Sequence, residues 1–296
     1  MNVSTQESTR GPVPPVNGLL RDKGRALGKA PLYLALIVLS GLFLIPFFWL
    51  VTTSLKTQAQ IFGSGWIPRP AQWSNYADVF ASTDFLLWTR NSFIVAILGM
   101  VTVAYSSALI AYPFAKMSFP LKNVLFALVM ATMMLPGAVT MVPTFLIWRG
   151  LGLVNTLWPL WAGNLFGSAF YIFMLRQFLL TIPNDLRDAA MVDGASHFRT
   201  FWSVMLPLVK PALIAVMLFE FIAKWNDYMT PLIYLNQEAL YTLPLGLATF
   251  LQSQGFQTRW DLWMAGSVLM TLPILILFFA GQRFFIQGIA TTGLKG

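Results

Sequence analysis

The sequence predicts an all-α membrane protein with six transmembrane helices. Of its 296 residues, 57% are hydrophobic and only 10% are charged, whereas a soluble domain carries about 25% charged residues. Six apolar stretches are each long enough to cross a bilayer, which takes roughly 20 helical residues. An isolated segment in lipid satisfies its backbone hydrogen bonds only as a helix, and none of these stretches alternates as a barrel strand would. They cover residues 32–55, 92–114, 124–148, 157–180, 208–235 and 262–285.

The basic residues predict the direction of the chain, because cytoplasmic loops are enriched in lysine and arginine. With the N-terminus inside, most of the 19 lysine and arginine residues lie inside or at the inner edge, and both termini are cytoplasmic. The exceptions are Lys224 within a span and, outside, Lys56, Arg69, Arg90, Arg149 and Arg259. Since the basic residues lie at the ends of apolar stretches, the net charge of +8 does not indicate a nucleic-acid partner.

Residues 1–30 are predicted to be a disordered cytoplasmic tail, and residues 31–296 a single domain. The tail is charged, contains the proline-rich segment 11–15 and lacks the apolar core of a secretory signal peptide. The first apolar stretch is therefore expected to remain in the protein as its first span.

Prolines and glycines predict local features of the third and fourth spans. Pro136 and Pro143 should bend the third span. Gly163 and Gly167 in the fourth span should form a face for close helix packing.

The external segment 57–89 is rich in aromatic residues, including Trp66, Trp73 and Tyr76. A short helix near Ser74 is expected there. It is either an anchor at the membrane interface or a docking surface for an external partner.

A polar loop, residues 181–207, separates the fourth and fifth stretches. Gly194 predicts where a first helix ends, because glycine readily adopts the left-handed conformation. Ser196 can cap a second helix, which Pro207 ends. Four apolar residues of this second helix follow the i, i+3, i+4, i+7 spacing of one helical face: Phe198, Phe201, Trp202 and Met205.

The residues of the 181–207 loop resemble the cytoplasmic coupling motif of permease subunits in ABC importers. That motif reads Glu-Ala-Ala, two residues, Asp-Gly-Ala, and then an apolar helix with a proline at its end and a second proline beyond. This chain has Asp188-Ala-Ala190, Asp193-Gly-Ala195, Pro207 and Pro211, so that only the shorter acid Asp188 departs from the motif. The resemblance implies a two-helix cytoplasmic coupling loop that contacts an ATPase subunit through Asp188, Ala189, Ala190, Asp193, Gly194, Ala195, His197, Phe198 and Pro207.

Two further segments resemble carbohydrate importers, and in particular the second permease of maltose-type systems. They are the Trp-Asn-Asp-Tyr run at 225–228 and the C-terminal tail 286–296. The family implies a sister permease, two ATPase subunits and an extracytoplasmic solute-binding protein, in the lipid of a prokaryotic inner membrane. The implied substrate is a sugar, an oligosaccharide or a polyol derivative. The tail is expected to contact the ATPases through Gln287, Gly288, Lys295 and Gly296.

We expect neither enzyme activity nor a cofactor in this chain. A phosphate-binding loop needs G-x-x-x-x-G-K-[ST], and the nearest run, 24–30, has one residue too few between its glycines and ends in alanine. There is no cysteine, and the one histidine, His197, has no cluster of partners for a metal site. ATP and Mg²⁺ are therefore expected on partner ATPase subunits.

The fifth stretch carries three charges, each of which costs about 2.5–3.5 kcal/mol near the bilayer centre. On a continuous helix, Glu220, Lys224 and Asp227 share one face. This face is either a self-neutralised stripe toward the sister subunit or a polar wall of the translocation path, to which Asn226 and a sugar-stacking Trp225 would contribute. An alternative is an ion-coupled secondary transporter or channel in which the three charges relay protons or ions, although the inverted repeats typical of such transporters are not evident.

Overall fold

The computed structural model describes residues 18–63, 65–253 and 259–290, and in these ranges the chain is helical without a strand. The all-α prediction is therefore confirmed. Three helices are long and apolar enough to cross a membrane, or up to six spans are present if each of three bent helix pairs is one span. The chain divides into two units, residues 1–50 and 51–296, which are described separately.

The first unit consists of most of α1 (Gly18–Ser54), which contains the predicted first span. Its large apolar side chains, such as Leu34, Ile37 and Phe43, are exposed, as expected for a helix surrounded by lipid or by another chain. Residues 18–30 are helical, although their composition predicted a disordered tail. Extending an existing helix costs far less than nucleating one, and this segment is rich in good helix formers.

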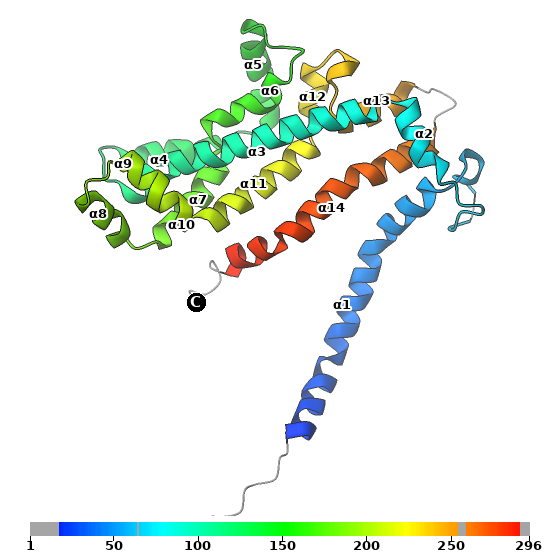
Figure 1. Ribbon diagram of the computed structural model, residues 1–296, viewed down its shortest axis with the longest axis horizontal. Helices are drawn as coiled ribbons and strands as arrows, with labels where there is room; N and C mark the ends of the chain where they lie inside the picture. The colour runs from blue at the N-terminus through cyan, green and yellow to red at the C-terminus, as the bar shows by residue number, and fades with distance from the viewer. Residues whose placement is uncertain (1–17, 64, 254–258, 291–296) are drawn as a thin grey trace, which may run out of the picture. The chain divides into compact units, whose positions relative to one another are not determined.

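The second unit is built around α3 (Phe85–Lys116). Both α7 (Ala169–Thr181) and α11 (Lys210–Trp225) pack against α3, and α14 (Trp260–Ala290) packs along α11 (Figure 1). Four fully buried small residues on α3 let the neighbouring backbones approach closely: Ala96, Ala104, Ala108 and Ala111.

The predicted third span is two helices rather than one bent helix. α4 (Lys122–Thr132) and α5 (Gly137–Gly150) are bent by 97° relative to each other. Pro136 is the N-cap of α5, and a proline disfavours helical conformation in the residue that precedes it. The bend predicted at Pro136 is therefore found, and it divides the span into two helices, whereas Pro143 lies inside α5.

The predicted fourth span is also interrupted. A short α6 (Trp158–Trp161) and the 3₁₀-helix η2 (Ala162–Phe166) precede α7. Between η2 and α7, Gly167 has a φ of +77°, a backbone conformation that glycine adopts at no steric cost. Gly163 has no other atom within 4 Å of its Cβ position. Gly167 does lie close to α3, since a Cβ there would be 3.0 Å from Cδ1 of Ile110, but Gly163 faces open space, so the two glycines do not form one packing face.

Several short helices complete the second unit. η1 (Gln58–Gln60) and α2 (Ser74–Ser82) precede α3, while α12 (Met229–Tyr234), η4 (Glu238–Leu240) and α13 (Leu243–Ser253) follow α11. No helix was predicted at α13, which packs against α3 and α14. Three of its leucines are nevertheless buried: Leu243, Leu245 and Leu247.

Gly246 packs directly against Trp88 of α3. A Cβ at Gly246 would lie 2.2 Å from Cδ2 of Trp88, whose ring is buried and cannot easily move. We expect Gly246→Ala to lower the free energy of unfolding by about 1–3 kcal/mol through overpacking. The control is Gly150→Ala, because no other atom lies within 4 Å of that Cβ position. Equal melting temperatures of the two variants in detergent would contradict this close approach.

Candidate functional site

The 181–207 loop forms four short helical segments at one end of the second unit (Figure 1). They are α8 (Asp185–Val192), α9 (His197–Thr200), the π-helix η3 (Phe201–Met205) and α10 (Leu206–Leu208). The chain bends by 81° from the fourth predicted span into α8, and by 79° from α10 into α11. Pro207 lies inside α10, so it does not end the helix as predicted. The loop therefore crosses the ends of α7 and α11 instead of continuing them.

Gly194 ends α8, as predicted from the sequence. Its φ is +83°, its N–H donates to the Met191 carbonyl at 3.0 Å, and the Ala195 N–H donates to the Ala190 carbonyl at 3.0 Å. These two bonds form a Schellman motif, which satisfies the last carbonyls of a helix. No other atom lies within 4 Å of the Cβ position at Gly194, so the glycine serves the backbone conformation and its surroundings are open.

The second helix of the loop begins as predicted, but the predicted apolar face does not form. The Ser196 hydroxyl accepts a hydrogen bond from the Arg199 N–H at 3.3 Å. Phe201 and Met205 are buried in the core, whereas Phe198 is 63% and Trp202 is 42% exposed. The prediction of a single apolar face is therefore wrong. The π-helix over residues 201–205 changes the angle between successive side chains, so the spacing of an α-helix no longer applies.

Hydrogen bonds attach α8 to the end of α3. The Arg187 guanidinium donates to the Lys116 carbonyl and, from Nε at 2.8 Å, to Oδ1 of Asp188. Lys116 Nζ donates in turn to the Ile182 carbonyl and, at 2.9 Å, to Oδ1 of Asn184. The last carbonyls of a helix lack intrahelical partners and carry partial negative charge, so cations are stabilising there. The sequence marked Arg187 and Lys116 only as inner positive charges, because no local pattern shows that they meet.

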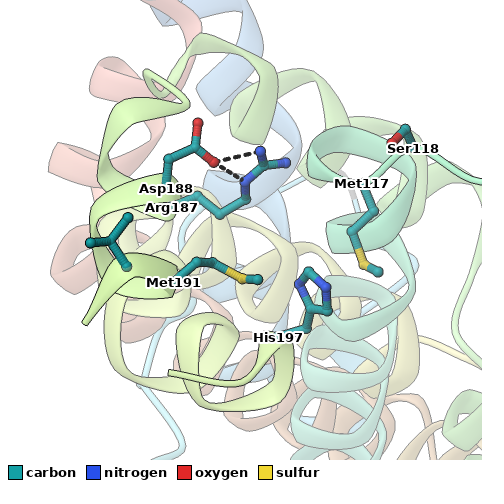
Figure 2. Close-up of a pocket in the computed structure, with 7 residues that line it drawn as sticks. Met117, Ser118, Arg187, Asp188, Met191 and His197 are labelled. Atoms are coloured by element: carbon teal, nitrogen blue, oxygen red, sulfur yellow. Dashed lines mark hydrogen bonds and ion pairs between the residues drawn. The ribbon is translucent and has the colours of Figure 1, made fainter. Parts of the chain in front are cut away.

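A surface hollow of about 390 Å³ lies between α8, α9 and the segment after α3 (Figure 2). Two of the predicted coupling residues, Asp188 and His197, line it, and Val192, at 87% exposed, lines it as well. The sequence missed five of its residues: Met117, Ser118, Arg187, Met191 and Val192. The remaining predicted coupling residues divide between the exposed Ala189, Asp193, Gly194, Phe198 and Pro207 and the half-buried Ala190 and Ala195.

The predicted charged face of the fifth span does not form. α11 ends at Trp225, and Oδ1 of Asp227 accepts a hydrogen bond from the Thr230 N–H at 3.1 Å, at the start of α12. Asp227 therefore leaves the helical face of Glu220 and Lys224, and its carboxylate instead accepts a hydrogen bond from the first turn of α12. Those two remain together, with Lys224 Nζ 3.8 Å from Oε1 of Glu220, and both side chains are largely buried.

Trp225 is buried and unavailable to stack on a sugar, so this expectation is wrong. Its ring packs against Phe93 and Phe221, and its Nε1 donates to the Met270 carbonyl at 3.0 Å. A buried aromatic ring with a satisfied N–H is stable inside the apolar core. Asn226, by contrast, is exposed, and its amide donates to the Ile222 carbonyl.

The predicted C-terminal tail is described only in part. α14 continues to Ala290, so Gln287 and Gly288 are helical rather than part of an extended tail. Lys295 and Gly296 lie outside the described residues.

Comparisons with known proteins agree with this architecture. The family described as "Binding-protein-dependent transport system inner membrane component" matches residues 100–291. The arabinooligosaccharides transport system permease protein AraQ of Bacillus subtilis (strain 168) is 33% identical over 276 residues, which are 90% of this chain and 96% of AraQ. The lactose transport system permease protein LacG of Rhizobium radiobacter is 32% identical over 86% of this chain and 93% of LacG.

The fold is also found in a solved structure. A chain from the crystal structure of a bacterial ABC transporter involved in the import of the acidic polysaccharide alginate aligns with a TM-score of 0.73 and 23% identity. The alignment covers 92% of this chain and all of that chain. From the family match, the relatives and the fold, this chain belongs to the inner-membrane components of binding-protein-dependent transport systems and is a permease subunit of an ABC importer.

Proposed function

We propose that this chain forms half of the translocation path for a sugar, oligosaccharide or polyol derivative, and that the 181–207 loop couples it to a separate ATPase. The observation that carries the proposal is the surface of this loop, which exposes Val192, Phe198 and the hollow beside Asp188. Exposed apolar side chains with polar neighbours are typical of a protein interface. An ATPase subunit is the partner that fits, because this chain has no phosphate-binding loop of its own.

In this proposal the chain crosses a prokaryotic inner membrane six times, and both termini and the 181–207 loop are cytoplasmic. We assign the six spans to α1, α3, α4–α5, α6–α7, α11–α12 and α14. The positive-inside rule supports the direction, since Lys116, Lys122, Arg176, Arg187 and Arg199 lie at or near the 181–207 loop.

Transport would follow from movement of the 181–207 loop. When two ATPase subunits close on ATP, the docked loop is displaced and moves α7 and α11, which lead into and out of it. The path then opens alternately to the two sides. A sister permease would form the other half of the path, an external solute-binding protein would deliver the substrate, and the tail 286–296 would provide further ATPase contact.

The substrate class is supported by the relatives. AraQ and LacG are named for arabinooligosaccharide and lactose transport, and UgpE of Yersinia pestis, 32% identical over 87% of this chain, for sn-glycerol-3-phosphate. In this chain, Asn226 and Asp227 at the end of α11 are the candidate path residues, because Asn226 is exposed and Asp227 is partly exposed. An ion relay through the fifth span fits less well, since Asp227 is separated from Glu220 and Lys224 by the end of the helix.

Purification and reconstitution test the proposed function. The chain purified from membranes with its partners should carry a stoichiometric ATPase and a second permease. In proteoliposomes, uptake of the oligosaccharide that the solute-binding protein binds should require ATP and that protein. Proton-driven uptake by this chain alone would contradict the proposal and support the secondary transporter.

Asp188→Glu tests the one departure from the coupling motif. We expect ATP-driven uptake to stay within about twofold, because the longer side chain keeps the charge and an exposed ion pair is worth only about 0–1 kcal/mol. The side chain of Asp188 is 54% exposed. Asp188→Ala, which removes the carboxylate, is the matched comparison. A large loss in Asp188→Glu alone would show that the shorter acid is specifically required.

A further inference from the structure

Four polar side chains, two of them buried and two half-buried, lie together where the predicted fourth span is interrupted. Oε1 of Glu220 accepts a hydrogen bond from Nδ2 of Asn164 at 2.6 Å, and this amide also donates to the Gly99 carbonyl at 3.1 Å. Lys224 Nζ, 3.8 Å from Glu220, donates to the Leu160 carbonyl at 2.7 Å. The Tyr171 hydroxyl interacts with the same carboxylate. We call Asn164, Tyr171, Glu220 and Lys224 the polar cluster.

The polar cluster compensates for the interrupted helix. An unsatisfied backbone group in lipid costs several kcal/mol, so irregular backbone at membrane depth needs partners. Lys224 satisfies the Leu160 carbonyl. Two serines of α3 complete the pairing: the Ser106 hydroxyl donates to the Asn164 carbonyl at 2.8 Å, and the Ser107 hydroxyl accepts from the Ser168 N–H at 3.1 Å.

The surface of α3 is shaped for this arrangement. A Cβ at Gly99 would lie 3.1 Å from Cγ of Lys224 and 3.3 Å from Nδ2 of Asn164. Any larger residue at 99 would push both side chains away from α3. The polar cluster therefore joins three elements: α3, η2–α7 and α11. It does so next to the helix break at Gly167, where α7 would otherwise be able to pivot.

We infer that the polar cluster makes α3, α7 and α11 move as one body, and that Asn164, Glu220 and Lys224 are positioning residues for transport. α7 and α11 flank the 181–207 loop, so displacement of the loop acts on both. Without the cluster, α7 would pivot at Gly167, and the movement would not reach α6 and η2. This inference rests on the proposed coupling function.

An exchange of the bonded pair provides the test. Asn164→Asp places a second carboxylate against Glu220, and like charges at this distance repel strongly. Adding Glu220→Gln removes the second charge and restores the bond between residues 164 and 220 with donor and acceptor exchanged, while the Gly99 carbonyl still lacks its donor. In proteoliposomes containing the complete complex, Asn164→Asp should lower the substrate transported per ATP hydrolysed by about tenfold or more. The double variant should recover a large part of this loss, as expected for directly coupled residues.

Two further variants separate positioning from general stability. Lys224→Met keeps the side-chain stem beside Gly99 but loses the bond to Leu160, and should also lower the transport-to-hydrolysis ratio about tenfold. Asn91→Leu is the control, because Asn91 is buried on α3 and donates to the Ala239 and Tyr241 carbonyls, outside the polar cluster. Asn91→Leu should lower the melting temperature of the complex without changing the amount of substrate transported per ATP hydrolysed.

Three outcomes would overturn the inference. The first is normal transport per ATP hydrolysed in Lys224→Met or Asn164→Asp, and the second is a loss of transport in Asn164→Asp that Glu220→Gln does not reduce. The third is an equal loss of transport per ATP hydrolysed in Asn91→Leu. Failure of the unmodified complex to take up substrate with ATP would instead contradict the proposed function.

Discussion

Gly194→Val is expected to abolish transport while the subunit still folds and inserts. At φ +83° a β-branched residue is strained by about 1–3 kcal/mol. A Cβ there would meet no atom of this chain within 4 Å, so the strain stays in the turn between α8 and α9. That turn sets the relative position of Asp188 and His197, which line the same hollow. Loss of a central interface residue costs about 2 kcal/mol or more, which predicts a fall in ATP-driven uptake of about thirtyfold or more.

The chain supplies a matched control for this variant. Gly152 has a φ of +70° and no other atom within 4 Å of its Cβ position, so Gly152→Val introduces the same strain away from the 181–207 loop. It should retain uptake. Gly194→Asn, which tolerates the left-handed conformation, should lie between the two. Equal uptake by Gly152→Val and Gly194→Val would contradict the coupling role of the turn.

Arg187→Met is expected to uncouple ATP hydrolysis from uptake. The guanidinium bonds the Lys116 carbonyl at the end of α3 and the Asp188 carboxylate on α8. A hydrogen bond to a charged group is worth about 1.5–3 kcal/mol, so its loss should lower the equilibrium ratio of correctly placed to displaced α8 by about 10–100-fold. The complex should assemble and hydrolyse ATP, while uptake falls in proportion. Both rates are measured on the same proteoliposomes.

Arg199→Met is the control for the loss of charge. Arg199 is exposed on α9, in the same loop and on the same side of the proposed membrane. Its replacement removes one inner positive charge without breaking the attachment of α8 to α3, and should leave uptake per ATP unchanged. Loss of uptake in Arg199→Met equal to that in Arg187→Met would indicate that net charge, rather than the Lys116 contact, is what matters.

Local chemistry made part of the 181–207 loop predictable. The end of α8 at Gly194 and the cap at Ser196 depend on residues within a few positions, so the sequence alone identified both. The division of the apolar residues between core and surface was not predictable in this way. It depends on the π-helix at 201–205 and on which side chains meet α3, and neither is encoded in a spacing rule.

Hydrogen bonds between residues far apart in the chain could not be predicted from the sequence, for a physical reason. Arg187 meets the Lys116 carbonyl across 71 positions, and Asn164 meets Glu220 across 56. A buried polar group takes whichever partner the packed helices bring near it. The three charges of the fifth span were assigned to one face because a continuous helix was assumed, and α11 instead ends before Asp227.

The sequence by itself determined the all-helical class, the positions of the apolar stretches and the place of the polar loop, because the cost of exposing apolar side chains or unpaired backbone groups acts residue by residue. Only the tertiary structure decided where helices break, which charges are buried and what holds α8 in place. A helix break leaves backbone groups unpaired, and this cost is offset only by side chains from other helices. Those side chains come within reach only once α3, α7 and α11 are packed together.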